Sequence, residues 1–352
     1  MKNYYLGFVF FFFTCRIEVS LAQDVHFSQY YTFAQALNPA LTGNFDGSYR
    51  VAVIYRNQWS SFLNKNAFVT PGVAIDLPLF EGQLKNDNLG LGFMFTNDRV
   101  GEASLVTSNI GLSLAYHKGI GRLGNHRISL GGQVAYVQRS MDRESYVFYD
   151  QFDVISHSGL GYSSEFDANN FDRGAFFYFD YNFGLYWKSQ FSDHFKMQGG
   201  FSTFHMSQPS QWFISENDDI FLKRRYQGDL GIEIFLSDKL ALAPDILYQK
   251  QGVNHMILAG SSLGYYFSSG FRTNSSVHLG ARYRLSPVNG DAVVVLSSVE
   301  FRNMRIGASY DVNLSNLQNS SNLKGAFEIS LIYMGESIRS YKANKSLPAR
   351  RF

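Results

Sequence analysis

The chain has 352 residues, of which 45% are hydrophobic and 16% aromatic, and its formal net charge is only +2. A near-neutral chain without a zinc-finger or helix-turn-helix pattern argues against a nucleic-acid partner. The eight histidines lack the short paired spacing of a zinc site, and no compact nucleophile motif such as G-x-S-x-G occurs. The sequence therefore predicts neither an enzyme nor a protein that depends on a metal or a cofactor.

Residues 1–22 have the pattern of a secretory signal peptide. Lys2 provides a positive start, residues 6–13 an apolar core, and Ser20-Leu21-Ala22 a small-x-small cleavage site. The apolar core is too short to cross about 30 Å of hydrocarbon as a helix, and no other run is long enough. We expect the mature chain to begin at Gln23 and to lose the single cysteine with the signal.

Residues 23–48 form a separate segment before the first predicted strand. Five of its residues have the spacing of one helix face: Phe27, Tyr30, Tyr31, Ala34 and Leu37. Asn38-Pro39 ends this pattern because proline disfavours the α conformation in the residue before it. We predict a short amphipathic helix that either plugs a barrel lumen or docks at its periplasmic rim.

The region 49–334 is dominated by an alternation of apolar and polar or small side chains. Between 110 and 117 one face carries Ile110, Leu112, Leu114 and Tyr116, and the other Gly111, Ser113, Ala115 and His117. Successive side chains of a strand point to opposite faces, so each segment has a lipid-facing and a polar side. We predict an all-β fold, a transmembrane antiparallel barrel of about fourteen strands. The predicted strands are 49–56, 67–77, 88–97, 104–118, 126–138, 174–188, 194–206, 224–236, 240–250, 254–267, 276–285, 291–301, 304–312 and 325–334.

A soluble β-sandwich or jelly roll would also show this alternation. Its strands usually have about five or six residues, whereas many of the predicted strands are roughly twice as long. The strand lengths therefore favour the barrel.

The lengths of the predicted connections give the barrel a direction. The long ones follow odd-numbered strands, at 139–173, 207–223 and 313–324, whereas most connections after even-numbered strands are short. Bacterial barrels have short periplasmic turns and longer external loops. This parity predicts that both termini are periplasmic, including the basic tail 335–352. The exception is 78–87, which is long for a periplasmic turn.

Motifs at both ends of the mature chain resemble one family. QDxxFSQYY begins at Gln23, LNPAxTG at Leu37 and YRNQW at Tyr55, and GAFEISL begins at Gly325. In this order they resemble the PorP/SprF family of outer-membrane proteins associated with the type IX secretion system of Bacteroidota. The family often has Cys-Pro before the last basic residue and Phe, whereas Ala349-Arg350 stands here.

The resemblance implies a non-enzymatic barrel that supports export or surface retention of cargo proteins, including gliding adhesins in gliding species. It also implies association with periplasmic parts of the secretion machinery and indirect attachment to peptidoglycan. Candidate partner-binding residues are Phe27, Ser28, Gln29, Tyr30, Asn38, Pro39, Arg56, Gln58, Trp59, Arg350, Arg351 and Phe352. Structural roles for the same residues stay open, with Trp59 as an interfacial anchor and Arg56 bonded to the N-terminal segment.

An alternative function is that of a porin or transporter for small solutes, because about fourteen strands enclose room for a pore. Charged residues at inward positions would then line the lumen and select solutes. The candidates are Arg50, Glu233, His278, Arg282 and Arg284, together with Arg56.

Overall fold

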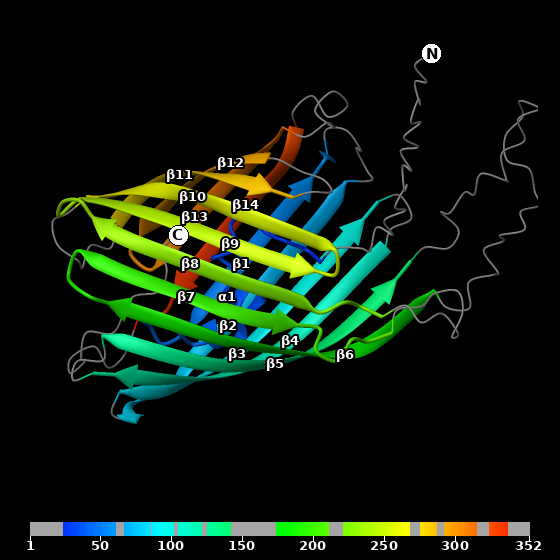
Figure 1. The fold of residues 1–352 in the computed structure, drawn as a ribbon, viewed down its shortest axis with the longest axis horizontal. Coiled ribbons are helices and arrows are strands. Elements are labelled where there is room, and N and C mark those ends of the chain that lie inside the picture. The colour runs from blue at the N-terminus through cyan, green and yellow to red at the C-terminus, as the bar shows by residue number, and fades with distance from the viewer. Residues whose placement is uncertain are drawn as a thin grey trace, which may run out of the picture.

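The computed structural model describes residues 24–60, 67–84, 86–101, 105–121, 125–141, 174–210, 221–267, 275–286, 292–314 and 324–336. Their strands form one closed antiparallel barrel, in which β1 pairs with β14 and every other strand pairs with its sequence neighbours (Figure 1). The strands are β1 (Arg50–Gln58), β2 (Phe68–Leu84), β3 (Asp87–Val100), β4 (Leu105–Ile120), β5 (His126–Ser140), β6 (Ala175–Gln190), β7 (Phe195–Phe204), β8 (Arg225–Phe235), β9 (Leu240–Gln251), β10 (Asn254–Tyr266), β11 (Ser275–Leu285), β12 (Ala292–Phe301), β13 (Met304–Asn313) and β14 (Lys324–Met334). The predicted fold of fourteen strands is confirmed.

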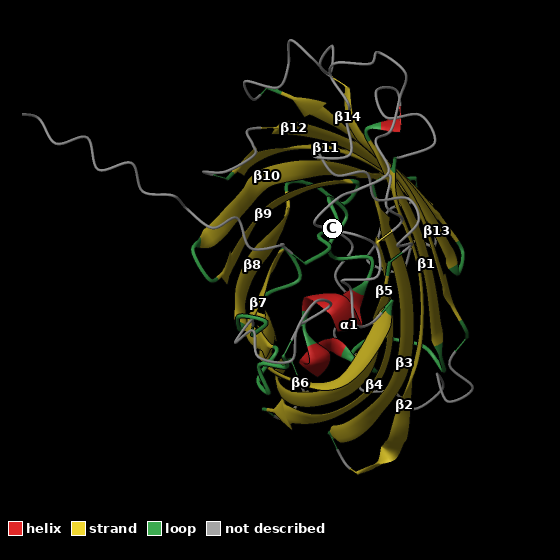
Figure 2. Cartoon of the chain, turned by 90° about the vertical axis from the view of Figure 1, so that its right-hand side faces the viewer, coloured by secondary structure: helices red, strands yellow, loops and turns green. Residues whose placement is uncertain are grey.

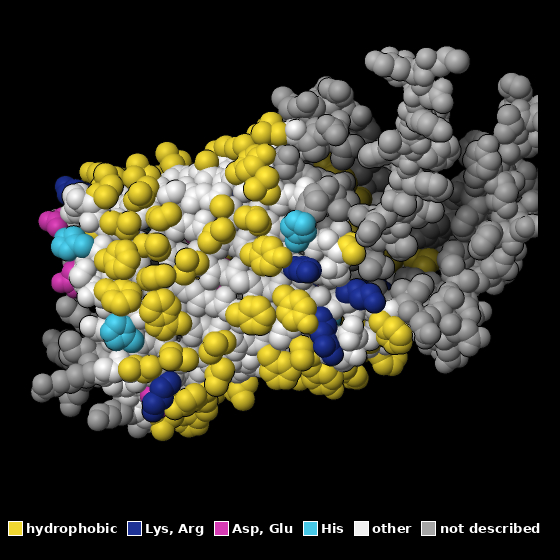
Figure 3. All heavy atoms as spheres, in the orientation of Figure 1, with side chains coloured by type: hydrophobic (Ala, Val, Ile, Leu, Met, Phe, Trp, Pro, Cys, Tyr) yellow, Lys and Arg dark blue, Asp and Glu magenta, His cyan; other side chains and the backbone are white. Residues whose placement is uncertain are grey.

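The two faces of the barrel wall differ as the alternation predicts. In β4, Leu112 and Leu114 are 60% and 54% exposed, whereas Ala115 and His117 are 1% and 0% exposed. Hydrophobic side chains spread over the outer surface, and charged ones lie toward its two ends (Figure 3). Such a belt is unfavourable in water but suits hydrocarbon, so the outer face is the lipid-facing one. No helix of the described residues is long and apolar enough to cross a membrane.

The predicted loop 78–87 is wrong. β2 continues to Leu84 and β3 begins at Asp87, so the strands meet at a tight turn. Pro78 does not end the strand, because it pairs with Gly90 and the ladder shifts register beyond Leu79, where Phe80 has a φ of 58°. The tight turn between the two strands removes the exception to the loop parity.

The predicted N-terminal helix is much shorter than its sequence pattern. The helical part consists of α1 (Ala34–Leu37) and the 3₁₀ turn η1 (Pro39–Leu41). Earlier in the segment, the backbone N–H groups of Ser28 and Gln29 donate to the Glu328 carboxylate and make no helical hydrogen bonds. The helix ends before Asn38, as predicted, and the Asn38 side chain caps η1 by accepting from the Ala40 N–H at 2.9 Å.

The N-terminal segment, residues 24–48, runs through the barrel from one end to the other. At the end of the short connections, Ser48 N donates to Gly335 O at 3.0 Å. At the opposite end, Asp24 contacts Arg225 and Gln251, which begin β8 and end β9. The first and last described residues therefore lie at opposite ends, and the prediction that both termini share one side does not hold for them. Loop parity orients only the strands and does not orient a segment that folds back into the lumen.

Candidate functional site

The lumen of the barrel is occupied by the chain's own N-terminal segment (Figure 2). This segment shares hydrogen bonds or hydrophobic clusters with all fourteen strands. Ser28 and Gln29 are 0% and 1% exposed although both are polar. Buried polar groups are stable only when they are hydrogen-bonded, so their partners define how the segment is held.

A cluster of four charged wall residues surrounds Ser28. The N–H groups of Ser28 and Gln29 donate to the two Glu328 carboxylate oxygens, at 2.7 and 2.9 Å. The Ser28 hydroxyl donates to Asp311 at 2.7 Å and accepts from Arg56 and Arg284. Arg284 pairs with Asp311 at 2.8 Å, and Arg56 pairs with both carboxylates. Two arginines and two carboxylates balance in charge, which permits their burial together.

Gln29 fits a gap in the wall made by a glycine. Its Oε1 accepts from Ser330 at 2.7 Å, and its Nε2 donates to Ser309 at 3.3 Å. A Cβ on Gly307 would lie 2.4 Å from Gln29 Oε1. The glycine at this position leaves the space that the amide occupies.

Two hydrophobic clusters pack the aromatic residues of the segment against two different parts of the wall. Tyr30 and Tyr31 pack with leucine, valine and methionine side chains of β9, β10 and β12, and Phe27 and Phe33 pack with residues of β1, β2, β3 and β14. The Arg282 guanidinium lies 5.2 Å from the Tyr31 ring centre and forms two hydrogen bonds with Asp245, of 2.8 and 2.6 Å. Arg282 is thus engaged by a carboxylate and an aromatic ring.

The Asn38-Pro39 turn lies against a strip of glycines on β5, β6 and β7. Asn38 Nδ2 donates to the carbonyl groups of Leu185 and Phe201, at 3.0 and 3.2 Å. A Cβ on Gly184 would lie 1.8 Å from Asn38 Oδ1, and a Cβ on Gly131 would lie 2.4 Å from the Ala40 nitrogen. The strip allows the backbone of the segment to approach the wall more closely than any side chain would permit.

Residues 41–43 are held near the end of the barrel that carries the short connections. Asp76 accepts from Gly43 N at 2.6 Å and pairs with Arg50 at 2.7 Å. His117 Nε2 donates to the Thr42 carbonyl at 2.8 Å. Gly43 has a φ of +70°, the left-handed conformation that favours glycine at this reversal toward β1.

At the other end of the segment, His205 bridges Asp24 to the wall. Its Nε2 bonds to Asp24 and its Nδ1 to Asp180, the latter at 2.7 Å, while Arg225 pairs with Asp24 at 3.0 Å. Burial of the ring lowers the pKa, but the two carboxylates outweigh burial and raise the pKa of His205 to about 9. With both ring nitrogens facing carboxylates, His205 is protonated at neutral pH and holds Asp24 in place.

This contact predicts that the start of the segment loosens in alkali. A pKa raised from 6.5 to about 9 gives a stabilisation that is complete below about pH 6.5 and lost as the pH rises through 9. Because the single cysteine, Cys15, lies in the predicted signal peptide, Val25→Cys gives the mature chain a specific site for a spin label. The label is expected to become more mobile between pH 7 and pH 10, whereas with His205→Gln it is mobile at both. A spectrum that does not depend on pH would contradict this role of His205.

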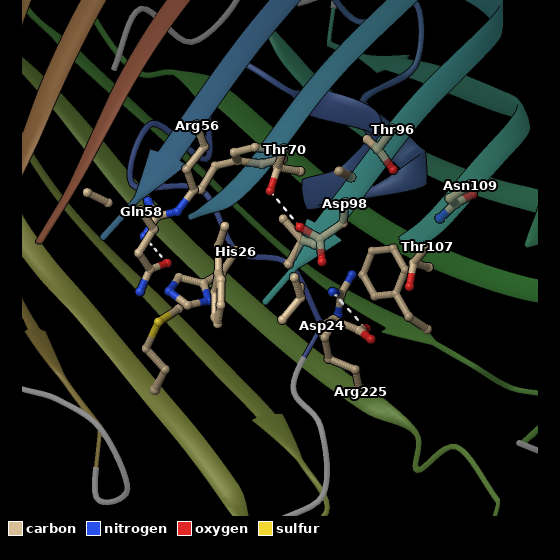
Figure 4. Close-up of a pocket in the computed structure, with 18 of the residues that line it drawn as sticks. Asp24, His26, Arg56, Gln58, Thr70, Thr96, Asp98, Thr107, Asn109 and Arg225 are labelled. Atoms are coloured by element: carbon tan, nitrogen blue, oxygen red, sulfur yellow. Dashed lines mark hydrogen bonds and ion pairs between the residues drawn. The ribbon is translucent and has the colours of Figure 1, made fainter. Parts of the chain in front are cut away.

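Above the N-terminal segment lies a cavity of about 450 Å³ that faces the end of the long connections. Its base contains Asp24, Val25 and His26, and its walls come from inward positions of the surrounding strands (Figure 4). Within the described part of the chain, no group of histidine, cysteine and carboxylate side chains is arranged to hold a metal ion. Threonine, asparagine, charged and aromatic side chains line the cavity.

Nine of the twelve candidate partner-binding residues belong to this assembly. Phe27, Ser28, Gln29, Tyr30, Asn38 and Pro39 are buried in the lumen, Arg56 contacts Ser28, and Gln58 and Trp59 line the cavity. Trp59 also packs on Phe68, with ring centres 5.0 Å apart. Arg350, Arg351 and Phe352 lie outside the described residues.

The five candidate lumen residues have partners inside the barrel. Glu233 pairs with Lys196 at 3.1 Å, His278 bonds to Ser276 at 2.8 Å, and Arg50, Arg282 and Arg284 pair with carboxylates. The sequence interpretation missed those carboxylates, Asp76, Asp245 and Asp311, as well as Glu328 and the glycine strip. The alternation of inward and outward positions along each strand was the signal that could have placed these four acidic residues in the lumen.

Comparisons with known proteins give a family and more distant likenesses. The chain is similar to the CymD monoaromatic hydrocarbon channel, with a TM-score of 0.48 and 10% sequence identity over 87% of this chain and 93% of that chain. It is also similar to the toluene transporter TbuX of Ralstonia pickettii, with a TM-score of 0.47 and 10% identity over 87% of this chain and 93% of that chain. CdiB from Acinetobacter baumannii is similar as well, with a TM-score of 0.43 and 10% identity over 81% of this chain and 60% of that chain. Curated proteins give no match. The family model described as type IX secretion system membrane protein PorP/SprF matches residues 19–333, and the chain belongs to this family of outer-membrane β-barrels.

Proposed function

We propose that this protein is a non-enzymatic accessory of type IX secretion that supports export or surface retention of a cargo protein from a barrel closed by its own N-terminal segment. Membership of the PorP/SprF family supports the secretion role. The observation that carries the closed state is the burial of residues 27–30 among ion pairs and hydrophobic clusters that reach every strand.

The proposed orientation places the long connections outside the cell and the short ones in the periplasm. The N-terminal segment then enters the lumen from the periplasmic end, and the cavity faces outward. The longest connection contains Tyr146, Phe148, Tyr149, Phe152 and Tyr162 among charged residues, a composition suited to protein recognition, and lies outside the described residues. We assign cargo contact to these external loops.

The alternative function, a porin or transporter for small solutes, requires an open lumen with free charged groups. The inward arginines instead pair with Asp76, Asp245 and Asp311 or bind the N-terminal segment. An N-terminal segment held from all sides opposes steady solute flow. The secretion role is therefore preferred over the porin role.

The proposed periplasmic partners are other components of the secretion machinery. Through these components the barrel would be attached indirectly to peptidoglycan. The basic tail 335–352 supplies Arg339, Lys342, Lys345, Arg350 and Arg351 for acidic surfaces. All five lie outside the described residues. Outer-membrane lipid surrounds the exposed apolar belt.

Deletion of residues 340–352 tests this assignment. The barrel is expected to remain in the outer membrane, because the strands end at Met334, while less secretion machinery co-purifies with it. A matched variant with Lys342, Lys345, Arg350 and Arg351 replaced by Gln keeps the length and should give the same loss if charge is responsible. Unchanged co-purification together with unchanged cargo secretion would contradict the proposed function.

A further inference from the structure

We propose that the cavity above the N-terminal segment binds a neutral oligosaccharide. The cavity has a volume of about 450 Å³. Ligand sites in proteins usually have roughly 300–1,000 Å³, so the space suits a small ligand and not a folded domain. This inference is independent of the secretion role, which uses the external loops and the tail.

One wall of the cavity is a row of short polar side chains on β2, β3 and β4. The register pairs Thr96 with Asn109 and Asp98 with Thr107, and Thr70 donates to Asp98 at 2.6 Å (Figure 4). Among the described residues, the hydroxyl groups of Thr96 and Thr107 have no hydrogen-bond partner. The row offers both donors and acceptors, which is the pattern that matches sugar hydroxyl groups, since each hydroxyl can donate and accept.

Aromatic rings line the cavity beside this polar row. Trp59 and Phe68 pack together at an interplanar angle of 59°, and Tyr178 lines the cavity from β6. The Phe204 ring on β7 is covered on one face by the Arg225 guanidinium, 4.0 Å from the ring centre. Flat aromatic surfaces next to a few placed polar groups are suited to a ring that has an apolar face and a polar edge. A pyranose ring has this shape.

The charges of the cavity select against an ionic ligand. Four arginines and four aspartates line it, and most are paired: Asp24 with Arg225 at 3.0 Å, Asp311 with Arg284 at 2.8 Å and Asp180 with His205 at 2.7 Å. A phosphate or carboxylate ligand would have to break these pairs. The barrel is closed, so no unpaired strand edge is available for an extended peptide.

The test is calorimetric titration of the purified mature protein in detergent with maltotriose, cellotriose, mannotriose and chitotriose. Binding of at least one of them is expected. Asp98→Asn should weaken that binding roughly tenfold, because a hydrogen bond to a charged acceptor becomes one to a neutral amide. Asp87→Asn is the matched control, since Asp87 lies at the opposite end of β3 and bonds to Lys118 at 2.8 Å. Both variants should keep the gel shift that folded barrels show on heating.

The same sugar chemistry could come from a free polysaccharide or from lipopolysaccharide. Titration with lipopolysaccharide, with its released oligosaccharide and with lipid A distinguishes these sources. Binding of the released oligosaccharide supports the proposal whichever source is used. The proposal is overturned if no saccharide binds, if lipid A alone accounts for binding, if only anionic compounds or peptides bind, or if the Asp98 and Asp87 variants lose affinity equally.

Discussion

Deleting residues 23–43 is expected to convert a closed barrel into a conducting pore. A barrel of fourteen strands encloses a wide lumen, and the structure fills it with this segment. In planar bilayers, the intact protein should show little steady current and the deletion variant a stable conductance that rises linearly with voltage. The barrel closes through the pairing of β1 with β14, which does not involve the segment, so the wall itself should still close.

The control for this experiment is the variant lacking residues 340–352, which removes a terminal segment from outside the barrel strands and should not conduct. Heat-dependent gel mobility establishes that both variants are folded. Steady current through the intact protein, equal to that of the 23–43 deletion, would contradict the closed state and favour the porin alternative.

Gly131→Ala is expected to push the Asn38-Pro39 turn off the wall, whereas Gly132→Ala should have little effect. The added Cβ at Gly131 would lie 2.4 Å from the Ala40 nitrogen, a backbone atom that cannot rotate away. At Gly132 the nearest atom is the Phe183 ring at 3.8 Å, an ordinary contact. Overpacking of this kind typically costs about 1–3 kcal/mol, here as weaker docking of the segment.

The measurement is protease cleavage within residues 24–43, together with the bilayer current. Gly131→Ala should increase both, and Gly90→Ala should act similarly, because its Cβ would lie 1.9 Å from the Thr42 carbonyl oxygen. Equal behaviour of the Gly131 and Gly132 variants would show that the close approach does not hold the segment.

The barrel wall was predictable because the pattern that specifies each strand lies within that strand's own residues. Alternation such as that of residues 110–117 specifies which side chains face lipid, and a strand with one apolar face can satisfy its backbone in a membrane only by closing into a barrel. The prediction failed at 78–87, where a long connection was expected and the two strands instead extend to Leu84 and from Asp87. A bulge depends on how the neighbouring strand accommodates the irregularity, so a single strand's pattern did not reveal it.

The N-terminal segment was predictable only in part. The stop at Asn38 was correct, but the helix covers only Ala34–Leu37, and the N–H groups of residues 28 and 29 bond with Glu328, about 300 positions away in the chain. Long-range hydrogen bonds of this strength outweigh a weak helix propensity. Nothing in the local pattern indicates that such partners exist.

The sequence by itself determined the number of strands, most of their bounds, the lipid-facing side of each and the family motifs. Only the tertiary structure decided that the motif residues fill the lumen, that the first described residue lies at the end opposite to Glu336, and that Gly131 and Gly184 form a docking strip. Strand periodicity arises from the geometry of neighbouring residues and is therefore visible in the sequence. The fit of a segment inside a closed wall depends on distances between residues that come together only when the barrel closes.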